Sequence, residues 1–393
     1  MTVERLRPYA VTVFAAMSAR AAQLGAVNLG QGFPDEDGPP AMLKIAENAI
    51  ADGVNQYPPG LGIAPLREAV AAQRKRHFGI EYDPDTEVLI TVGATEAIAA
   101  AVLGLVEPGS EVVLIEPFYD SYSPVVAMSG CERVTAPLVP DERGFALDLD
   151  ALRTAVTPRT RALIVNSPHN PTGMVLRDTE LAAIAEIAAD ADLLVITDEV
   201  YEHLVFSTPA GAKHLPLAGY PGMAERTVTI SSAAKMFNCT GWKIGWACGP
   251  ADLIAGVRAA KQYLSYVGGA PFQPAVTHAL NTEDAWVAAL RDSLQTKRDR
   301  LAAALADIGF DVHDSSGTYF LCADPRPLGY HDSTAFCAEL PERAGVAAIP
   351  LSAFCDPDGR HAGAWNHLVR FAFCKRDDTM AEAVRRLAVL RRD

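Results

Sequence analysis

The sequence has few of the features that mark secreted, membrane-bound or nucleic-acid-binding proteins. Its seven cysteines, among 393 residues, are scattered without a Cys-x-x-Cys pair, which fits a reducing cytosol and predicts neither a disulfide framework nor a zinc site. Acidic residues outnumber basic ones, 48 to 34, for a formal net charge of -14, which disfavours nucleic acid and anionic membranes as partners. The longest apolar helical stretch, residues 97–106, is far below membrane-spanning length. We therefore expect a cytoplasmic protein without a metal site.

Short β-branched runs alternate with segments whose apolar residues recur at helical spacing. The runs lie at residues 88–92, 112–115, 162–165, 193–197 and 227–230. Such alternation predicts an α/β fold with a mostly parallel sheet and helices on both faces. After about residue 285 a long helical pattern and several shorter strands and helices predict a smaller α+β lobe.

Lys235 lies in the run Ser-Ser-Ala-Ala-Lys-Met-Phe-Asn-Cys-Thr-Gly-Trp-Lys, residues 231–243. The small and hydroxyl residues around it follow a β-rich run, so the amine is expected to be partly desolvated. Desolvation lowers the pKa of an amine and makes it a nucleophile toward carbonyl groups. The alternative is an ordinary surface lysine beside a strand.

Three motifs together resemble one enzyme family. The spacing of Ser232, Lys235 and Lys243 is similar to the segment that carries the Schiff-base lysine in pyridoxal 5'-phosphate (PLP) aminotransferases of class I and II. Asn-Pro-Thr-Gly at residues 170–173 and Thr-Asp-Glu-Val-Tyr at residues 197–201 match two further family signatures. The resemblance extends over nearly the whole chain.

The resemblance implies PLP fold type I and a particular division of the chain. Residues 41–284 would form a large PLP-binding domain with a mostly parallel seven-stranded sheet flanked by helices. Residues 285–393 would form the small α+β domain, and residues 1–40 an N-terminal arm together with part of that domain.

The resemblance also implies PLP as cofactor and assigns roles around its ring. Lys235 would bind the cofactor and act as the general base. Asp198, at the end of a buried-looking strand, would keep the pyridine nitrogen protonated, although a cap on the following turn is the alternative. Tyr201 and Asn170 would donate hydrogen bonds to the phenolic oxygen of the ring. The predicted catalytic residues are Lys235, Asp198 and Tyr201.

A phosphate site is predicted where an apolar helix follows a strand. The backbone amides of Gly93, Ala94 and Thr95 begin this helix, so that they and the helix dipole face an anion. The Ser232 hydroxyl and the Lys243 ammonium would complete the site.

Two aromatic residues are assigned by resemblance alone. Phe118, in the run Glu-Pro-Phe-Tyr-Asp at residues 116–120, resembles the aromatic that stacks on the cofactor ring; an ordinary core aromatic is the alternative. Tyr57 resembles the tyrosine that reaches the phosphate of the neighbouring subunit. This second resemblance implies a homodimer with shared active sites.

Arg370 is a charge in the apolar run Leu-Val-Arg-Phe-Ala-Phe, residues 368–373, where an unpaired charge is costly. The resemblance implies that it clamps the substrate α-carboxylate through two hydrogen bonds, with Asn170 and the backbone at Gly32 beside it. An edge-strand arginine paired within the protein is the alternative. Phe14 is expected to be a wall of the substrate pocket.

The implied reaction moves an amino group from an amino acid to 2-oxoglutarate in a ping-pong cycle. Within the family, the sequence most resembles N-succinyldiaminopimelate aminotransferases of lysine and diaminopimelate biosynthesis, which implies N-succinyl-LL-2,6-diaminopimelate as donor. Kynurenine, glutamine-phenylpyruvate or methionine aminotransferase activity and cysteine-conjugate β-lysis remain alternatives. A non-catalytic effector-binding module of the same fold is the alternative from a different class.

Overall fold

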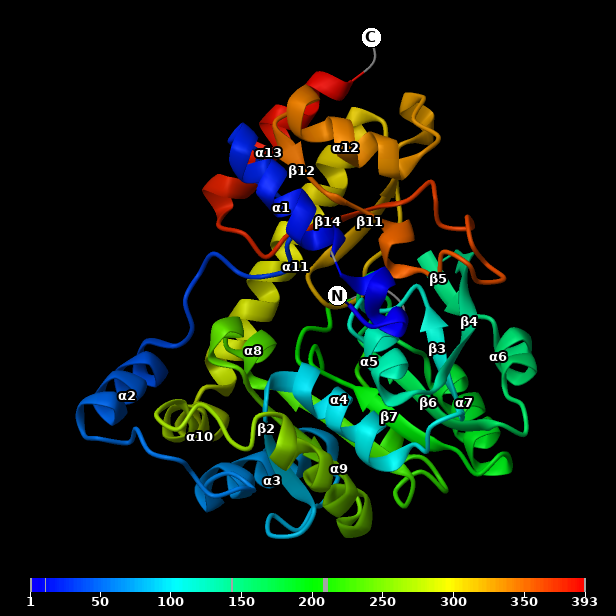
Figure 1. Cartoon of the computed structure of the whole chain (residues 1–393). Helices are drawn as coiled ribbons and strands as arrows, with labels where there is room; N and C mark the ends of the chain where they lie inside the picture. Colours follow the sequence, from blue (N-terminus) through cyan, green and yellow to red (C-terminus); the bar gives the residue numbers. More distant parts are fainter. Residues whose placement is uncertain (1, 11, 143, 208–210, 392–393) are drawn as a thin grey trace.

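A computed structural model describes residues 2–10, 12–142, 144–207 and 211–391. Its main feature is a mixed sheet of eight strands in the order β2-β9-β8-β7-β6-β3-β4-β5 (Figure 1). The strands are β2 (Val88–Val92), β3 (Glu111–Glu116), β4 (Glu132–Asp141), β5 (Gly144–Leu147), β6 (Thr160–Asn166), β7 (Leu194–Asp198), β8 (Thr227–Ser232) and β9 (Ile244–Cys248). β8, β7, β6, β3 and β4 run parallel to one another, whereas β9 is antiparallel to both β2 and β8.

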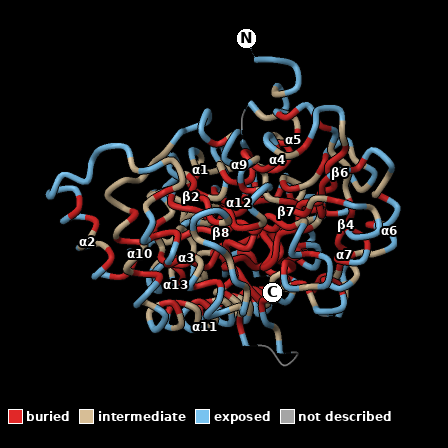
Figure 2. Tube along the Cα trace, turned by 90° about the horizontal axis from the view of Figure 1, so that it is seen from below, coloured by how far each residue is buried: buried red, intermediate tan, exposed pale blue. Residues whose placement is uncertain are grey.

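The pleat of these strands separates two apolar layers, because successive side chains point to opposite faces. Val112, Leu114 and Ile196 belong to the core that includes buried residues of α4 (Gly93–Leu105), α5 (Tyr122–Ser129) and α9 (Ala251–Leu264). Val113 and Val195 face the core formed with α6 (Leu149–Ala155) and α7 (Asp178–Asp190). Buried residues accordingly run along the strands through the centre of the molecule (Figure 2).

A further core fills the side of the sheet at β2 and β9. It contains buried residues of α2 (Pro40–Ala51), α3 (Ala64–Phe78) and α10 (Phe272–Thr282). α3 ends at Gly79, whose φ of 71° lies in the left-handed region that glycine adopts without strain. This packing brings α3 close to the strands whose ends carry the predicted cofactor residues.

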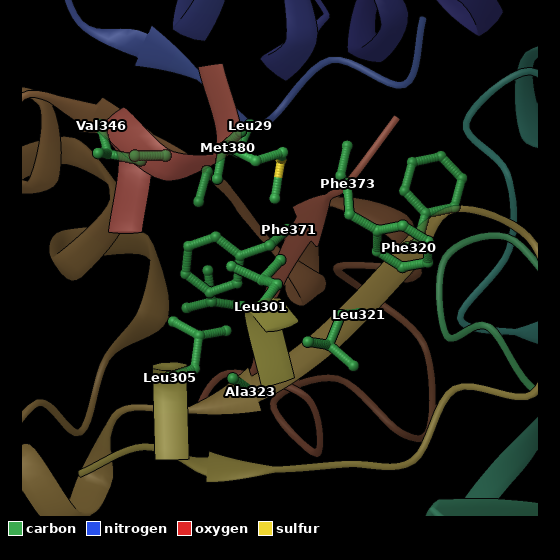
Figure 3. Close-up of a cluster of buried hydrophobic side chains, with 14 of the residues drawn as sticks. Leu29, Leu301, Leu305, Phe320, Leu321, Ala323, Val346, Phe371, Phe373 and Met380 are labelled. Atoms are coloured by element: carbon green, nitrogen blue, oxygen red, sulfur yellow. The ribbon is translucent and has the colours of Figure 1, made fainter. Parts of the chain in front are cut away.

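The C-terminal part has its own antiparallel sheet in the order β10-β11-β14-β13. Its strands are β10 (Asp311–Val312), β11 (Phe320–Asp324), β13 (Ile349–Pro350) and β14 (Val369–Ala372), and its helices are α11 (Asp284–Ile308), α12 (Ser333–Arg343) and α13 (Asp377–Leu387). Leu301 and Leu305 of α11 pack with Leu321 and Phe371 of the sheet (Figure 3). This core is separate from the layers around the eight-stranded sheet.

The N-terminal elements join this C-terminal part. β1 (Val27–Asn28) pairs in parallel with β12 (Val346–Ala347), and α1 (Val13–Leu24) lies beside α12 (Figure 1). α1 begins at Thr12, whose hydroxyl accepts a hydrogen bond from the Ala15 N–H at 3.2 Å. The domain limits at residues 40 and 284 remain a prediction.

The predicted fold class is confirmed, with one strand more than the seven expected. β5 extends the sheet by pairing antiparallel with β4. All five β-branched runs are strands, and the long helix predicted after residue 285 is α11. Among the described residues no helix is both long and apolar enough to cross a membrane.

Candidate active site

Most of the predicted site residues lie where the parallel strands of the eight-stranded sheet end. β3, β6, β7 and β8 all end there, and so does β2, because β2 and β8 are both antiparallel to β9. A cavity of about 370 Å³ opens at this edge. Its lining includes the predicted residues Phe14, Gly32, Gly93, Ala94, Thr95, Asn170, Asp198, Tyr201, Ser232, Lys235 and Lys243. Ligands of open α/β sheets bind at such an edge.

Lys235 lies on the short helix α8 (Ala233–Met236), directly after β8. Its Nζ lies 5.8 Å from the ring centroid of Tyr201 and 5.6 Å from that of Tyr319. Burial lowers the pKa of Lys235 to about 8, and the nearby cation Lys243 acts in the same direction. An amine with this pKa is available in its unprotonated form near neutral pH.

Asp198 ends β7 and is 4% exposed. The Tyr122 hydroxyl donates a hydrogen bond to its Oδ2 at 2.6 Å, and the Val200 N–H donates to its Oδ1 at 3.3 Å. Burial raises the pKa of Asp198 to about 6, although both hydrogen bonds and Lys235 oppose the increase. A cation placed against Asp198 in the cavity would therefore strongly favour the ionised carboxylate over the protonated form.

The Asn-Pro-Thr-Gly turn is fastened to the ends of β6 and β7. The Asn170 N–H donates to Asn166 Oδ1 at 2.8 Å, and Asn166 Nδ2 donates to the Asp198 carbonyl at 2.8 Å. His169 Nδ1 and the Thr172 hydroxyl share a hydrogen bond of 2.7 Å. Burial lowers the pKa of His169 to about 3, so this imidazole is neutral. The turn thus fixes Asn170 at the cavity wall.

Donors for an anion converge where α4 begins. Gly93 has a φ of 75°, and a Cβ added to it would lie 3.1 Å from Lys243 Nζ. On β9, which pairs with β2, a Cβ added to Gly245 would meet the Gly93 carbonyl carbon at 2.6 Å and the Ala94 nitrogen at 2.8 Å. These two glycines allow the helix N-terminus, with its free backbone amides, to approach the lysine closely.

Arg370 lies on β14 between β11 and β13, and it is 1% exposed. Its Nη1 donates to Asn170 Oδ1 at 2.8 Å and its Nη2 to the Gly30 carbonyl at 2.7 Å. The guanidinium carbon lies 4.0 Å from the ring centroid of Phe320 and 5.3 Å from that of Phe14. Burial lowers the pKa of Arg370 to about 10. Neither hydrogen-bond partner is anionic, so the guanidinium keeps its positive charge beside the cavity, whose lining includes its partner Asn170 but not Arg370 itself.

Comparison with known proteins decides the family. The family Aminotransferase class I and II matches residues 25–387. The chain belongs to this family. It is 79% identical to the probable N-succinyldiaminopimelate aminotransferase DapC of Mycobacterium tuberculosis, over 99% of this chain and 98% of that protein. It is 38% identical to the methionine aminotransferase of Escherichia coli, over 98% and 97% of the two chains.

Solved structures of aminotransferases have the same fold. The structure of N-succinyldiaminopimelate aminotransferase from Mycobacterium tuberculosis superposes with a TM-score of 0.96 at 80% identity, covering 99% of this chain and all of that one. YbdL from Escherichia coli, described as having a methionine aminotransferase function, gives 0.92 at 38% identity over 99% of both chains.

This aminotransferase is PLP-dependent, and its cavity fits the cofactor. The α4 amides, the Ser232 hydroxyl and the Lys243 ammonium could hold a phosphate. Lys235 would offer an amine to the aldehyde, and Asp198 would offer a buried carboxylate to the pyridine nitrogen. A small aromatic aldehyde that carries a phosphate thus has a complementary group at each polar end.

Phe118 requires a correction. It is buried in the core shared with α4 and α5, and its N–H donates to the Phe354 carbonyl at 2.7 Å. Of these two neighbouring aromatics it is Tyr119 that lines the cavity of the aminotransferase, whereas Phe118 is not among the described lining residues. The structure thus places Tyr119, and not Phe118, at the cavity that the predicted stacking residue was expected to line. The adjacent tyrosine was the available signal.

Tyr57 does not reach the cavity within one chain. Its side chain is 81% exposed and packs edge-to-face on Tyr266, with the ring centroids 5.7 Å apart. Its role at a neighbouring subunit therefore remains a prediction.

Sequence reasoning missed several residues of the aminotransferase site. Thr12, Gln31 and Asp120 line the cavity, and Tyr122 contacts Asp198 from behind it. Burial raises the pKa of Asp120, whereas Arg370 opposes the change. Asp120 lies shortly after the end of β3, and Asp198 is the last residue of β7. This position near a strand end was the signal that could have revealed Asp120.

Proposed function

We propose that this aminotransferase transfers the amino group of N-succinyl-LL-2,6-diaminopimelate to 2-oxoglutarate in a cytoplasmic route to diaminopimelate and lysine. The observation that carries the proposal is the 79% identity, over nearly the full length of both chains, to a relative named for that donor. Identities to the methionine and kynurenine enzymes are far lower, at 38% and 36%. The same cavity accommodates the 2-oxo acid in the second half of a ping-pong cycle.

The roles of the site residues are part of this proposal. Lys235 takes the substrate α-proton on Nζ and returns it within the site, which its lowered pKa supports. Asp198 faces the pyridine nitrogen, while Tyr201 and the Asn170 amide group face the ring oxygen. When bound, PLP supplies an electron-withdrawing ring that stabilises the negative charge left on the substrate α-carbon.

Substrate orientation depends on the opposite wall. Arg370 binds the α-carboxylate beside Asn170, and the backbone at Gly32 approaches the same group. Tyr319 supports this arrangement, since its hydroxyl donates to the Gly32 carbonyl at 2.5 Å. Phe14 closes the side of the cavity next to Arg370. A fixed carboxylate keeps the α-proton within reach of Lys235.

The functional unit in this proposal is a homodimer whose partner contributes Tyr57. Large side chains gather in an exposed group formed by Tyr57, Tyr263, Leu264 and Tyr266, of which Tyr57 and Tyr263 are 81% and 86% exposed. Large exposed hydrophobic groups of this kind mark interaction surfaces. Light scattering after size-exclusion chromatography measures the mass directly, and a monomeric active enzyme would contradict the shared site.

Steady-state kinetics with three donors test the substrate. We expect N-succinyl-LL-diaminopimelate to give the highest kcat/KM against 2-oxoglutarate, with parallel double-reciprocal lines that indicate a ping-pong cycle. A higher kcat/KM for kynurenine or methionine would reject the proposed donor. Release of pyruvate and ammonia from a cysteine conjugate without a 2-oxo acid would instead indicate β-lysis, and no turnover of any donor would indicate a binding module.

A further inference from the structure

A cluster of buried charged residues lies beside the cavity, and none of its members lines the cavity. Arg74 of α3 is 0% exposed, and its Nη2 donates to Glu199 Oε2 at 2.9 Å while its Nη1 is paired with Glu202 Oε2. The Phe78 ring covers the guanidinium, with its centroid 4.5 Å from the Arg74 carbon. One arginine therefore holds two buried carboxylates that stand three residues apart in the same segment.

The cluster has further polar members that fix both glutamates. His214 Nε2 lies 3.0 Å from Glu199 Oε2, and the Ser231 hydroxyl donates to Glu202 Oε1 at 3.0 Å. Glu199, Glu202 and His214 have the ligand atoms of a small metal site, but Arg74 already supplies the cation between the two carboxylates. The cluster is thus an ion network in its own right.

The cluster and the cavity share one segment of the chain. Asp198 and Tyr201 line the cavity, whereas Glu199 and Glu202, the next residue in each case, bind Arg74. The same division occurs at the end of β8, where Ser232 lines the cavity and the preceding Ser231 binds Glu202. Residues that face the cofactor site are therefore directly bonded, through the backbone, to residues held by Arg74.

We propose that Arg74 is a positioning residue of the transamination site, which holds Asp198 and Tyr201 in place by clamping Glu199 and Glu202 from below. This inference rests on the proposed roles of Asp198 and Tyr201. Arg74 touches neither the cavity nor a substrate, so its effect is on geometry. The fork of the guanidinium matters, because its two Nη groups reach Glu199 and Glu202 in a fixed planar geometry that the ammonium of a flexible lysine does not reproduce.

A core ion pair without this role would also stabilise the fold, so the two possibilities need separate measurements. In a purely structural pair, substitution lowers the unfolding temperature and leaves the properties of bound PLP unchanged. In a positioning pair, substitution shifts the ring contacts of Asp198 and Tyr201. A displacement of about 1 Å can reduce a catalytic rate about a hundredfold.

The test uses the PLP-loaded enzyme with Arg74→Lys, which keeps the charge but not the fork. Arg177→Lys is the matched control, because Arg177 also bridges two carboxylates, Asp141 at 3.0 Å and Glu180 at 2.7 Å, away from the cavity. For each variant we would measure the dissociation constant of PLP, the pH midpoint of its visible absorbance band, the unfolding temperature, and kcat and KM for the donor.

We expect Arg74→Lys to weaken PLP binding about tenfold, to move the absorbance midpoint and to lower kcat about tenfold or more, with KM changed less than threefold because Arg370 is untouched. Arg177→Lys should change only the unfolding temperature. Unchanged PLP affinity and absorbance in Arg74→Lys would overturn the inference. The absorbance and affinity need no substrate, so they are independent of the proposed donor.

A second variant separates loss of folding from loss of position. Arg74→Met combined with Glu199→Gln and Glu202→Gln removes all three charges together, so no buried charge is left unpaired. We expect it to recover the unfolding temperature of the unchanged enzyme but not its kcat or absorbance midpoint. Recovery of all three would overturn the inference. Asp198→Ala is the reference: if it leaves the absorbance unchanged, the proposed ring contacts and this inference both fail.

Discussion

Tyr122→Phe removes one hydroxyl, and the structure allows its consequence to be worked out in detail. The hydroxyl donates to Asp198 Oδ2 at 2.6 Å, and both side chains are buried. A hydrogen bond to a charged group contributes about 1.5–3 kcal/mol, and one between neutral groups about 1 kcal/mol. Loss of the Tyr122 hydroxyl therefore costs more free energy when Asp198 is ionised than when it is protonated.

The loss should therefore depend on pH. The pKa of Asp198 in the folded protein, about 6, lies above its ordinary value of 3.8, so the folded state binds more protons between these values and stability falls as pH rises from about 4 to 6. Without the Tyr122 hydroxyl the folded pKa rises by about one further unit, at 1.36 kcal/mol per unit. The fall in stability then continues above pH 6.

Urea unfolding of the cofactor-free protein at pH 5 and pH 8.5, at fixed protein concentration, measures this effect. We expect Tyr122→Phe to cost about 1 kcal/mol at pH 5 and about 2–3 kcal/mol at pH 8.5. Tyr220→Phe is the matched control, because Tyr220 donates to Asp178 at the same 2.6 Å but at the surface, and its cost should be below about 1 kcal/mol at both pH values. Equal losses at the two pH values for Tyr122→Phe would refute the reasoning.

Four further substitutions test the site. Lys235→Met should stabilise the cofactor-free protein by about 1–3 kcal/mol at pH 7. The gain should shrink above pH 8, where the buried amine, of pKa about 8, loses its proton; urea unfolding at pH 7 and 9.5 measures both. Gly93→Ala places a Cβ 3.1 Å from Lys243 Nζ at a φ of 75°, so equilibrium dialysis should show PLP binding weakened about tenfold; unchanged affinity would contradict the close approach. Tyr119→Leu should weaken PLP binding about fivefold, whereas Phe118→Leu should mainly lower the unfolding temperature, and the opposite ranking would restore the original prediction for Phe118.

The predictable parts of the fold are those in which a local pattern decides the structure. Five runs of β-branched residues became strands because nothing in them competes with a buried, pleated conformation. β9 was missed because its sequence, Ile-Gly-Trp-Ala-Cys, directly follows the lysine motif and contains glycine. β4 and β5 were missed because β4 carries charged residues and two prolines, which are uncommon in buried strands.

The site was predictable to the extent that its residues follow strands. The family resemblance assigned Asp198, Asn170 and Lys235 to one cofactor. Each of them ends or follows a strand, so the common end of the parallel strands brings them together. The contact of Tyr122 with Asp198 spans 76 residues of sequence, and no local pattern records it. Tyr57 is exposed in the single chain, so the role proposed for it depends on the proposed homodimer and not on the fold of one chain.

The segment Asp-Glu-Val-Tyr-Glu, residues 198–202, shows why a motif cannot be interpreted one residue at a time. Its first residue and its tyrosine face the cavity, while both glutamates face Arg74. A glutamate in a cofactor motif suggests a catalytic role, yet Glu199 and Glu202 both pair with Arg74 and neither lines the cavity. Their partner lies on α3, more than a hundred residues earlier in the chain. The geometry of the catalytic face therefore depends on contacts made by the opposite face, and a substitution at Arg74 is expected to affect transamination without touching any reacting atom.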